Sequence, residues 1–465
     1  MVTTDNWKSD AQRLGVYESV ADAIGNTPLV RINSVTDGAA APVYVKLEYL
    51  NPGGSVKDRA ALAMIRAAEA AGDLRPGGTV VEGTSGNTGV GLAMIAASHG
   101  YRTVVVVPDK TSAEKIALLR AHGAEVRVTP GGRPSHHPEF VRNVAARLAQ
   151  EIPGGWLAGQ YDNPANPAAH RMSTGPEIWN QTSGRISHFV AGIGTGGTVT
   201  GAGGYLKEVS GGTVTVIGAD PQHSVYGGGD GRAWYVEAVG HFLHPETEKD
   251  EWPDSYHPGI VDRIEQITDV EALVTLHRLA REEGLLLGGS SGIAVAAGLR
   301  AARNLDAEDV VVIVAPDSGR AYLSKYFDDG WLGPLGFPLY RKAPGPVIRD
   351  TLQNRYGPFR YIPASASVAA ARELIGKRES LPVALERSVP GPIPVGEILG
   401  IVTASGLREA RDAELATSHL APSLPTVGLT EPTSAAALRL TGHTGYVVVA
   451  DAGTAVGLVH VREIS

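Results

Sequence analysis

Residues 188–209 read HFVAGIGTGGTVTGAGGYLKEV and decide the fold class of the chain. An apolar run leads into a cluster of glycines, and a segment with helical spacing follows, which predicts a buried strand, a tight loop and a helix. Gly192, Gly194 and Gly197 satisfy the pattern G-x-G-x-x-G, so free N–H groups at the start of the helix are expected to bind a phosphate. The pattern does not identify that phosphate. A dinucleotide is one candidate, because a second apolar run ends at Asp220, 23 residues after Gly197.

The same alternation of strand and helix extends along most of the chain. Near-continuous Val and Ile runs predict strands buried on both faces, and segments with helical spacing lie between them. The chain is therefore expected to be an α/β protein with largely parallel sheets and right-handed crossovers. The expected strands are residues 43–48, 79–83, 103–108, 125–130, 188–194, 214–220 and 310–316, and the expected helices are residues 58–70, 88–98, 112–121, 198–209, 271–283 and 293–303.

A second candidate anion site lies in VEGTSGNTGVGLAMI, residues 81–95. Small polar residues here join the end of a strand to the start of an apolar helix: Thr84, Ser85, Gly86, Asn87 and Thr88. Their hydroxyl, amide and backbone N–H groups would form a cradle for a carboxylate or a phosphate. The alternative is an ordinary helix cap with a polar turn.

Two further segments add an amine and a neutral hydroxyl. In LEYLNPGGSVKDRAALAMI, residues 47–65, Lys57 lies near the positive start of a helix, where an amine has a lowered tendency to stay protonated. This suits Schiff-base chemistry, although most lysines are solvated surface charges. In GLLLGGSSGIAVAAGL, residues 284–299, Ser290 precedes a helix of small residues, and close packing is its ordinary explanation. Together the four segments supply the parts needed to hold pyridoxal phosphate and an amino acid.

Composition narrows the class of protein. The chain has 465 residues, no cysteine and a formal net charge of −8. Without cysteine it can form no disulfide, thiolate zinc site, iron–sulfur cluster or cysteine nucleophile, and no metal site is expected. The negative charge argues against nucleic acid or an anionic membrane as the main partner. The start of the chain lacks a signal-peptide pattern and no apolar run approaches about 18 residues, so a cytoplasmic protein is expected.

The character of the sequence changes after Trp331. Residues 336–347, GFPLYRKAPGPV, are rich in proline and glycine and predict a linker. Residues 348–465 contain two similar halves, each predicted to form a helix, a strand, a turn, a second strand and a second helix, which indicates a weak internal repeat. Neither half carries a cluster of acids, bases or metal ligands. This region is therefore expected to bind or dock rather than to catalyse.

Seven motifs occur in a fixed order: LNPGGSVKDR, EGTSGNTG, QYDNPANPAAH, GIGTGGTVTG, IGADP, EEGLLLGGSSG and APDSGRAYLSKYFDDGW. This set resembles the fold type II pyridoxal-phosphate β-replacement family of cysteine synthases and cystathionine β-synthases, most of all the haem-free bacterial cystathionine β-synthases. The resemblance implies a catalytic core at residues 1–335, with a smaller subdomain at about 44–154, and a linker at 336–347. Residues 348–465 resemble a degenerate pair of CBS regulatory modules.

The resemblance also implies roles for individual residues and favours pyridoxal phosphate over a dinucleotide. Lys57 would form the Schiff base with the cofactor and, once released, remove the Cα proton of the substrate. The other cofactor contacts would be Asn87 at the 3′-oxygen, Ser290 at the pyridine nitrogen, and Gly194, Thr195, Gly196, Gly197 and Thr198 at the phosphate. The substrate would be held by Thr84, Ser85, Gly86, Thr88, Gln160, Tyr161 and Gly240. Amino acids are the implied substrates, and a homodimer or higher homo-oligomer is the implied assembly.

Two reactions and one non-catalytic role are compatible with the residue roles that the resemblance implies. The first is cystathionine β-synthase chemistry, in which serine and homocysteine give cystathionine and water. The second uses sulfide or an amine as the nucleophile, giving cysteine or a diaminopropionate-type product. The third is a sensor that keeps the cofactor site without turnover, against which Lys57 and the intact TSGNT motif argue.

The chain departs from the family pattern in several places. Gly83 replaces a common proline, which predicts a looser loop. Residues 238–240 read Ala-Val-Gly where Gly-[Ile/Val]-Gly is usual, so a methyl group narrows the space for the nucleophile. An apparent insertion at residues 244–252 is either a solvated loop or an altered entrance for the second substrate. Residues 403–406 and 460–463 lack the aspartate typical of adenosyl-binding modules, which puts adenosyl regulation in doubt.

Overall fold

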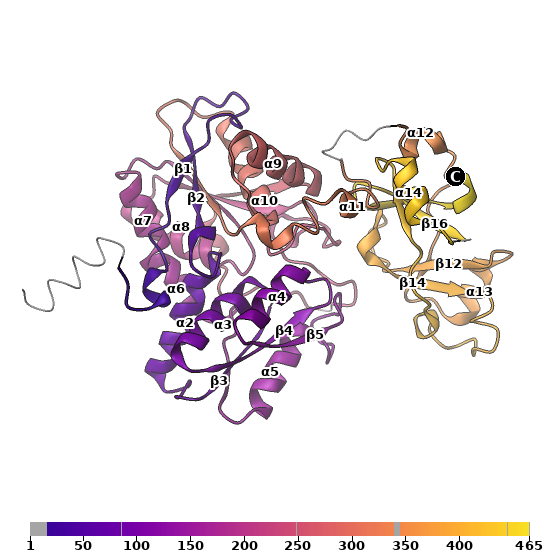
Figure 1. Cartoon of the computed structure of the whole chain (residues 1–465), viewed down its shortest axis with the longest axis horizontal. Helices are drawn as coiled ribbons and strands as arrows, with labels where there is room; N and C mark the ends of the chain where they lie inside the picture. Colours follow the sequence, from indigo (N-terminus) through magenta and orange to yellow (C-terminus); the bar gives the residue numbers. More distant parts are fainter. Residues whose placement is uncertain (1–15, 85, 248, 339–344, 444, 465) are drawn as a thin grey trace, which may run out of the picture. The chain divides into compact units, whose positions relative to one another are not determined.

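The computed structural model describes residues 16–84, 86–247, 249–338, 345–443 and 445–464. It divides into two compact units (Figure 1). The first consists of Met1–Gln222, Val236–His241 and Glu248–Tyr322, and the second of His223–Tyr235, Phe242–Thr247 and Leu323–Ser465. The second unit therefore contains two short segments from the middle of the chain in addition to the C-terminal region.

The first unit contains two sheets that are almost entirely parallel, which confirms the predicted α/β architecture. In the larger sheet only β1 runs antiparallel to its neighbour. Its strand order is β1 (Leu29–Arg31), β2 (Val43–Leu47), β10 (Val311–Ala315), β7 (His188–Gly192), β8 (Thr215–Pro221) and β9 (Arg263–Ile267). The smaller sheet is wholly parallel, in the order β5 (Glu125–Thr129), β4 (Arg102–Pro108), β3 (Thr79–Gly83) and β6 (Gly155–Leu157).

All seven expected strands and all six expected helices are present, with ends displaced by four residues or fewer. The expected helices are α2 (Lys57–Ala71), α3 (Asn87–His99), α4 (Ala113–Ala121), α8 (Gly197–Val209), α9 (Asp269–Glu282) and α10 (Gly289–Ala302). Among the described residues of the first unit, three further α-helices were not predicted: α5 (Val141–Glu151), α6 (Ala165–Met172) and α7 (Thr174–Gln181). Helix α6 contains Pro167 and helix α7 contains Pro176. Each proline lies in the first turn of its helix. Backbone N–H groups in this turn have no acceptor within the helix, so a proline, which lacks the N–H, is tolerated there.

The smaller sheet is covered on both faces because neighbouring residues of a strand point to opposite sides. Val80 of β3 packs with apolar residues of α2 and α3, whereas Val81 packs with α5. The prediction that every strand is buried on both faces was wrong for β5. This strand lies at the edge of the sheet, and Val128 is 53% exposed.

Four charged side chains connect β2, α2 and α7: Lys46, Glu48 and Arg59 are buried, and Glu177 is partly buried. Lys46 Nζ lies 2.7 Å from Glu177 Oε2, and Arg59 lies 2.6 Å from Glu177 Oε1 and 2.7 Å from Glu48 Oε2. Burial alone would raise the pKa of Glu177, but the hydrogen bonds and charge of Arg59 and the charge of Lys46 lower it to about 2. The cluster is balanced, with two positive and two negative groups. It fixes the first turn of α2, the helix that begins with Lys57.

The second unit contains two small mixed sheets. One has the order β11 (Ile362–Pro363), β12 (Ser380–Ala384) and β14 (Ile398–Thr403), and the other β13 (Ile393–Pro394), β17 (Thr454–His460), β16 (Tyr446–Asp451) and β15 (Thr426–Gly428). Each sheet contains a short strand, a parallel partner and an antiparallel third strand. A helix connects the parallel pair in both, α13 (Val368–Ile375) in the first and α14 (Thr433–Arg439) in the second.

Replacing Glu177 with Ala is expected to lower the free energy of unfolding by about 3–5 kcal/mol, because the buried Lys46 would lose its carboxylate partner and the buried Arg59 would lose one of its two. Denaturant unfolding monitored by circular dichroism measures this change. The matched control is Glu208→Ala, which removes the exposed pair with Arg171 and should cost about 1 kcal/mol or less. Equal stability losses in the two variants would contradict the role given to the buried cluster.

Candidate active site

Four helices begin around one cavity of the first unit. Lys57 is the first residue of α2, Asn87 the first of α3, Gly197 the first of α8, and Ser290 the second of α10. Lys57, Asn87, Gly194, Thr198 and Ser290 all line this cavity. Because the partial positive charge of a helix lies at its N-terminus, four such ends favour an anionic ligand. The structure thus brings together five of the residues predicted to contact the cofactor.

Lys57 has the properties of an amine that can lose its proton. Burial lowers the pKa of its ammonium group, and the charges of Asp317 and Glu48 only partly oppose this effect. Its backbone N–H donates to Ser55 Oγ at 3.2 Å, which fixes the start of α2. A lysine with a lowered pKa is a competent nucleophile toward an aldehyde.

The predicted phosphate loop can contain only glycine at two of its positions. A Cβ on Gly196, whose φ is +84°, would lie 2.3 Å from Tyr256 Cβ, and one on Gly197 would lie 2.1 Å from Asn166 Oδ1. Asn166 also donates from Nδ2 to Thr195 Oγ1 at 3.0 Å and to the Gln160 carbonyl at 2.8 Å. This close packing holds the backbone N–H groups at the start of α8 in place.

His170 is a buried neighbour of the same loop that sequence reasoning missed. Its Nε2 lies 3.2 Å from Thr198 Oγ1 and its Nδ1 lies 2.9 Å from Thr174 Oγ1. Burial and the charges of Lys57 and Arg59 lower the pKa of His170 well below its usual range. The imidazole is therefore neutral and orients the Thr198 hydroxyl without adding a charge.

The surroundings of the Ser290 hydroxyl indicate whether the cavity fits pyridoxal phosphate. Its side chain is 2% exposed, and Oγ has no hydrogen-bond partner among the described residues. A buried hydroxyl without a partner is costly unless a ligand supplies one. A pyridine nitrogen is such a partner. With an amine at Lys57 and the glycine loop before α8, the cavity has a group for each functional part of this cofactor.

The predicted carboxylate cradle lies beside this cavity. Thr88 Oγ1 donates to Gln160 Oε1 at 2.5 Å, and the Gly86 N–H donates to Thr84 Oγ1 at 3.2 Å. Gly86 has a φ of +127°, and a Cβ there would lie 2.7 Å from Lys115 Cδ. Ser85 lies outside the described residues.

The turn that carries Gln160 is fixed by a buried acid. The Gly159 N–H donates to Glu82 Oε2 at 2.8 Å. Burial raises the pKa of Glu82 to about 8, although the backbone hydrogen bonds from Gln160 and Gly159 lower it. The next residue, Tyr161, does not line the cavity, and its ring lies 4.7 Å from the Arg142 guanidinium.

The loop preceding the cradle is closely packed at Gly83. The prediction that glycine at this position makes the loop looser was wrong. A Cβ on Gly83 would lie 2.7 Å from the carbonyl oxygen of Val141. Because α5 begins at Val141, the bulkier proline common in the family would collide with this helix. Glycine at position 83 therefore reflects the close approach of α5.

Asp317 and Tyr322 were given no role by sequence reasoning. Asp317 Oδ2 accepts from Asn87 Nδ2 at 2.7 Å and from the Tyr322 hydroxyl at 2.5 Å. These contacts hold the amide of Asn87 at the start of α3. The available signal was the position of Asp317 two residues after the buried strand β10, since polar residues at the carboxyl ends of parallel strands commonly face ligands.

Ala238 and Val239 complete the cavity, whereas Gly240 lies outside its lining. The Gly240 N–H donates to the Ile193 carbonyl at 2.7 Å, which fixes the loop beside β7. Asp220, the acid considered for a ribose, is buried in β8 and does not line the cavity. This position removes the main support for a dinucleotide.

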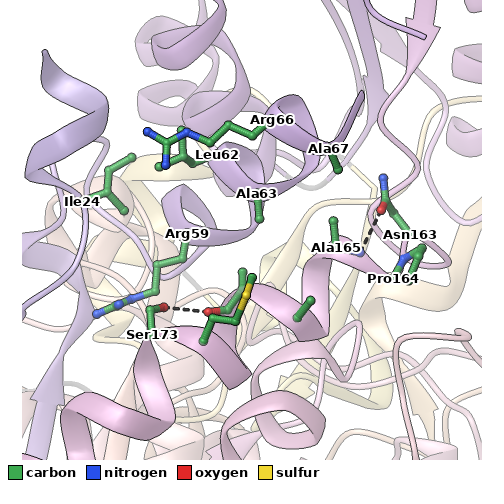
Figure 2. Close-up of a pocket in the computed structure, with 13 residues that line it drawn as sticks. Ile24, Arg59, Leu62, Ala63, Arg66, Ala67, Asn163, Pro164, Ala165 and Ser173 are labelled. Atoms are coloured by element: carbon green, nitrogen blue, oxygen red, sulfur yellow. Dashed lines mark hydrogen bonds between the residues drawn. The ribbon is translucent and has the colours of Figure 1, made fainter. Parts of the chain in front are cut away.

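A second and larger hollow of about 740 Å³ lies between α2 and α6 (Figure 2). Leu62, Ala63, Ala165 and Met172 give it a largely apolar wall, and Arg59 and Arg66 lie at one side. None of the predicted site residues lines it. Within the described ranges, no group of three or more His, Asp or Glu side chains could hold a metal ion. The same ranges contain no helix with the length and hydropathy of a membrane-spanning segment.

Comparisons with known proteins agree with this geometry. The chain is 42% identical over 324 residues to cystathionine beta-synthase of Apis mellifera, covering 69% of this chain and 64% of that protein. It therefore spans less than two thirds of the honeybee relative. It is 44% identical over 316 residues to a probable cysteine synthase of Bacillus subtilis, covering 67% of this chain and 97% of the relative.

A solved enzyme structure is also similar to this chain. The solved structure is of an O-ureido-L-serine synthase, a lysine-to-alanine mutant with O-ureido-L-serine bound. Its sequence is 38% identical to this chain, and the TM-score between the two structures is 0.62. The similarity covers 68% of this chain and 94% of that one. A family model described as pyridoxal-phosphate dependent enzyme matches residues 20–317. The chain belongs to this family of enzymes, and pyridoxal phosphate is its cofactor.

Proposed function

We propose that the chain catalyses a β-replacement on L-serine or an O-activated serine, in which the substituent at Cβ leaves and a nucleophile takes its place. The observation that carries this proposal is the common cavity of Lys57, Asn87 and Ser290, which joins an amine of lowered pKa to a neutral partner for the pyridine nitrogen. Relatives named cystathionine beta-synthase and probable cysteine synthase support the same reaction class.

Each group of the site then has a task. When bound, pyridoxal phosphate withdraws electrons from Cα of the amino acid. Lys57 holds the cofactor and takes the proton from Cα. Thr84, Thr88 and Gln160 orient the substrate carboxylate, and the N–H groups before α8 bind the phosphate. Ser290 donates a neutral hydrogen bond, so no charged partner keeps the ring nitrogen protonated, which favours departure of the β-substituent.

Homocysteine is the first candidate nucleophile, with cystathionine as product, because the honeybee relative carries that activity in its name. Sulfide or a small amine is the second candidate. The observation that favours it is Ala238, which lines the cavity where a glycine is usual in the family.

We also propose that the enzyme is a homodimer formed through the hollow between α2 and α6 (Figure 2). Its wall is largely apolar, and Met172, which lines it, is 72% exposed. Large exposed apolar side chains beside an apolar hollow are typical of protein–protein interfaces. A second copy of the chain is the expected occupant.

For residues 348–465 we propose a degenerate pair of CBS modules that follows the catalytic core. The support is the common order of elements in the sheets that contain β12 and β16. The Thr403 hydroxyl is used within its own turn, where it accepts from the Gly406 N–H at 2.9 Å. This use of Thr403 favours a structural role for the region over adenosyl binding.

The reaction is tested by supplying purified enzyme with serine or O-acetylserine and a panel of homocysteine, sulfide and small amines, and by identifying products by mass. We expect products in which the nucleophile has replaced the Cβ substituent. Lys57→Ala should lower turnover at least about 10⁴-fold, because the proton acceptor at Cα is lost. Near-normal turnover in this variant, or no product with any pair of substrates, would contradict the proposal.

The assembly is tested by light scattering after size exclusion. Wild type is expected as a dimer, and Met172→Glu should shift it toward the monomer because a charge would be buried in an apolar interface. Leu438→Glu is the matched control, since Leu438 is 77% exposed on α14 of the second unit and does not line the hollow. A monomeric wild type, or a dimer unaffected by Met172→Glu, would contradict this interface.

A further inference from the structure

Ala238 adopts a backbone conformation that an L-residue with a side chain rarely takes. Its φ is +66°, in the left-handed region, where Cβ crowds the following carbonyl oxygen. Glycine would accept this conformation without strain. Non-glycine residues persist in it when the surrounding structure enforces it, and such positions cluster at functional sites.

Three contacts hold the short segment Val236–His241 around this residue. The Val236 N–H donates to Asp269 Oδ1 at 3.0 Å, and the Gly240 N–H donates to the Ile193 carbonyl at 2.7 Å. Between them, Glu237 Oε2 lies 3.2 Å from Lys115 Nζ. Each contact comes from a different element: α9, the end of β7, and α4. The loop is therefore fixed on both sides of the strained residue.

Lys115 is itself an unusual lysine. Its side chain is fully buried, and its ammonium lies 4.4 Å from the centroid of the Tyr322 ring. Its aliphatic stem packs so closely on Gly86 that a Cβ there would lie 2.7 Å from Cδ. Lys115 thus links the loop that contains Glu237 to the carboxylate cradle. A buried cation with an anionic partner and an aromatic face has little freedom to move.

Ala238 lies directly at the reaction cavity. It lines the same space as Lys57 and Asn87, and its carbonyl oxygen would be 3.2 Å from a Cβ placed on Gly194 of the phosphate loop. A methyl group at this position occupies volume that a glycine would leave open. Because the backbone is held by the three contacts, the loop cannot withdraw to restore that volume.

We infer that Ala238 is a specificity-determining residue, which selects nucleophiles by how wide they are next to the reacting atom. The Lys115–Glu237 ion pair is the positioning contact that keeps Ala238 in place. This inference rests on the proposed β-replacement. Narrow nucleophiles such as sulfide pass the methyl group, whereas nucleophiles branched next to the reacting atom are rejected. A single methyl group in a closed pocket changes selectivity about 10- to 200-fold.

The test compares kcat/KM for sulfide and for 2-propanethiol in wild type and Ala238→Gly, each with its cofactor bound. We expect the ratio of the kcat/KM values, 2-propanethiol over sulfide, to rise at least about tenfold in the variant. The matched control is Ala452→Gly, which relieves the same kind of conformation (φ +46°) in the second unit. It should leave the ratio at the wild-type value.

Thermal unfolding supplies a readout that does not depend on catalysis. Because glycine relieves the left-handed strain, Ala238→Gly and Ala452→Gly should both unfold at or above the wild-type temperature. A clear drop in Ala238→Gly alone would contradict the strain at this loop. An unchanged ratio in an active Ala238→Gly enzyme would overturn the specificity role and leave the β-replacement intact. If wild type forms no product with sulfide or 2-propanethiol, the specificity role fails, and the β-replacement fails with it only when homocysteine and small amines also give no product.

Lys115→Met tests the positioning contact. We expect the ratio of kcat/KM values, 2-propanethiol over sulfide, to rise in this variant as well, because the ion pair between Lys115 and Glu237 is lost and the loop can withdraw. Lys249→Met is the control, since it removes an exposed pair with Glu251 in which both side chains are more than 70% exposed. Lys115→Arg, which keeps the charge, should restore part of the wild-type ratio. A wild-type ratio in Lys115→Met would overturn the positioning role.

Discussion

The balanced cluster of Lys46, Glu48, Arg59 and Glu177 is the constraint on which the catalytic unit depends. It joins β2 of the larger sheet to α2, which covers the smaller sheet, and to α7. Charges as deeply buried as these tolerate little displacement, because separating any pair would leave an ion in an apolar environment. Arg59 lies only two residues after Lys57. The cluster therefore sets where the reactive lysine lies relative to the strands of the larger sheet.

The site that results is polar without being strongly charged. Four helix N-termini supply partial positive charge, and the neutral groups Asn87, Thr198 and Ser290 supply hydrogen bonds. The neutral imidazole of His170 continues this pattern behind the phosphate loop. Such an arrangement binds an anionic cofactor while keeping Lys57 able to lose its proton. Its precision comes from glycines packed against Asn166 and Tyr256, where no side chain fits.

Much of this arrangement could be predicted from the sequence. Val and Ile runs identified the strands because parallel sheets covered on both faces need continuous apolar residues. Lys57, Asn87, Gly194 and Ser290 meet because each follows a strand or opens a helix at the same edge of the α/β structure. The short strand β6 and the proline-containing α6 and α7 were missed, because three residues give no periodicity and proline suggests a loop.

Other features depend on contacts between distant segments. Asp317 lies 230 residues from Asn87, and Glu237 lies 122 residues from Lys115, so no local pattern could pair them. The exposed edge position of β5 follows from strand order, which its Val-containing sequence does not reveal. The left-handed conformation of Ala238 is likewise imposed by anchors in other elements. These are tertiary constraints, and they concern the residues that refine the site rather than those that create it.

The central claim is that Lys57 forms the covalent bond to pyridoxal phosphate. Its most direct test is reduction of the cofactor-loaded protein with borohydride, followed by proteolysis and mass spectrometry of the peptides. The account predicts a phosphopyridoxyl group on the peptide that contains Lys57. A phosphopyridoxyl group on another lysine, or on none, would contradict it.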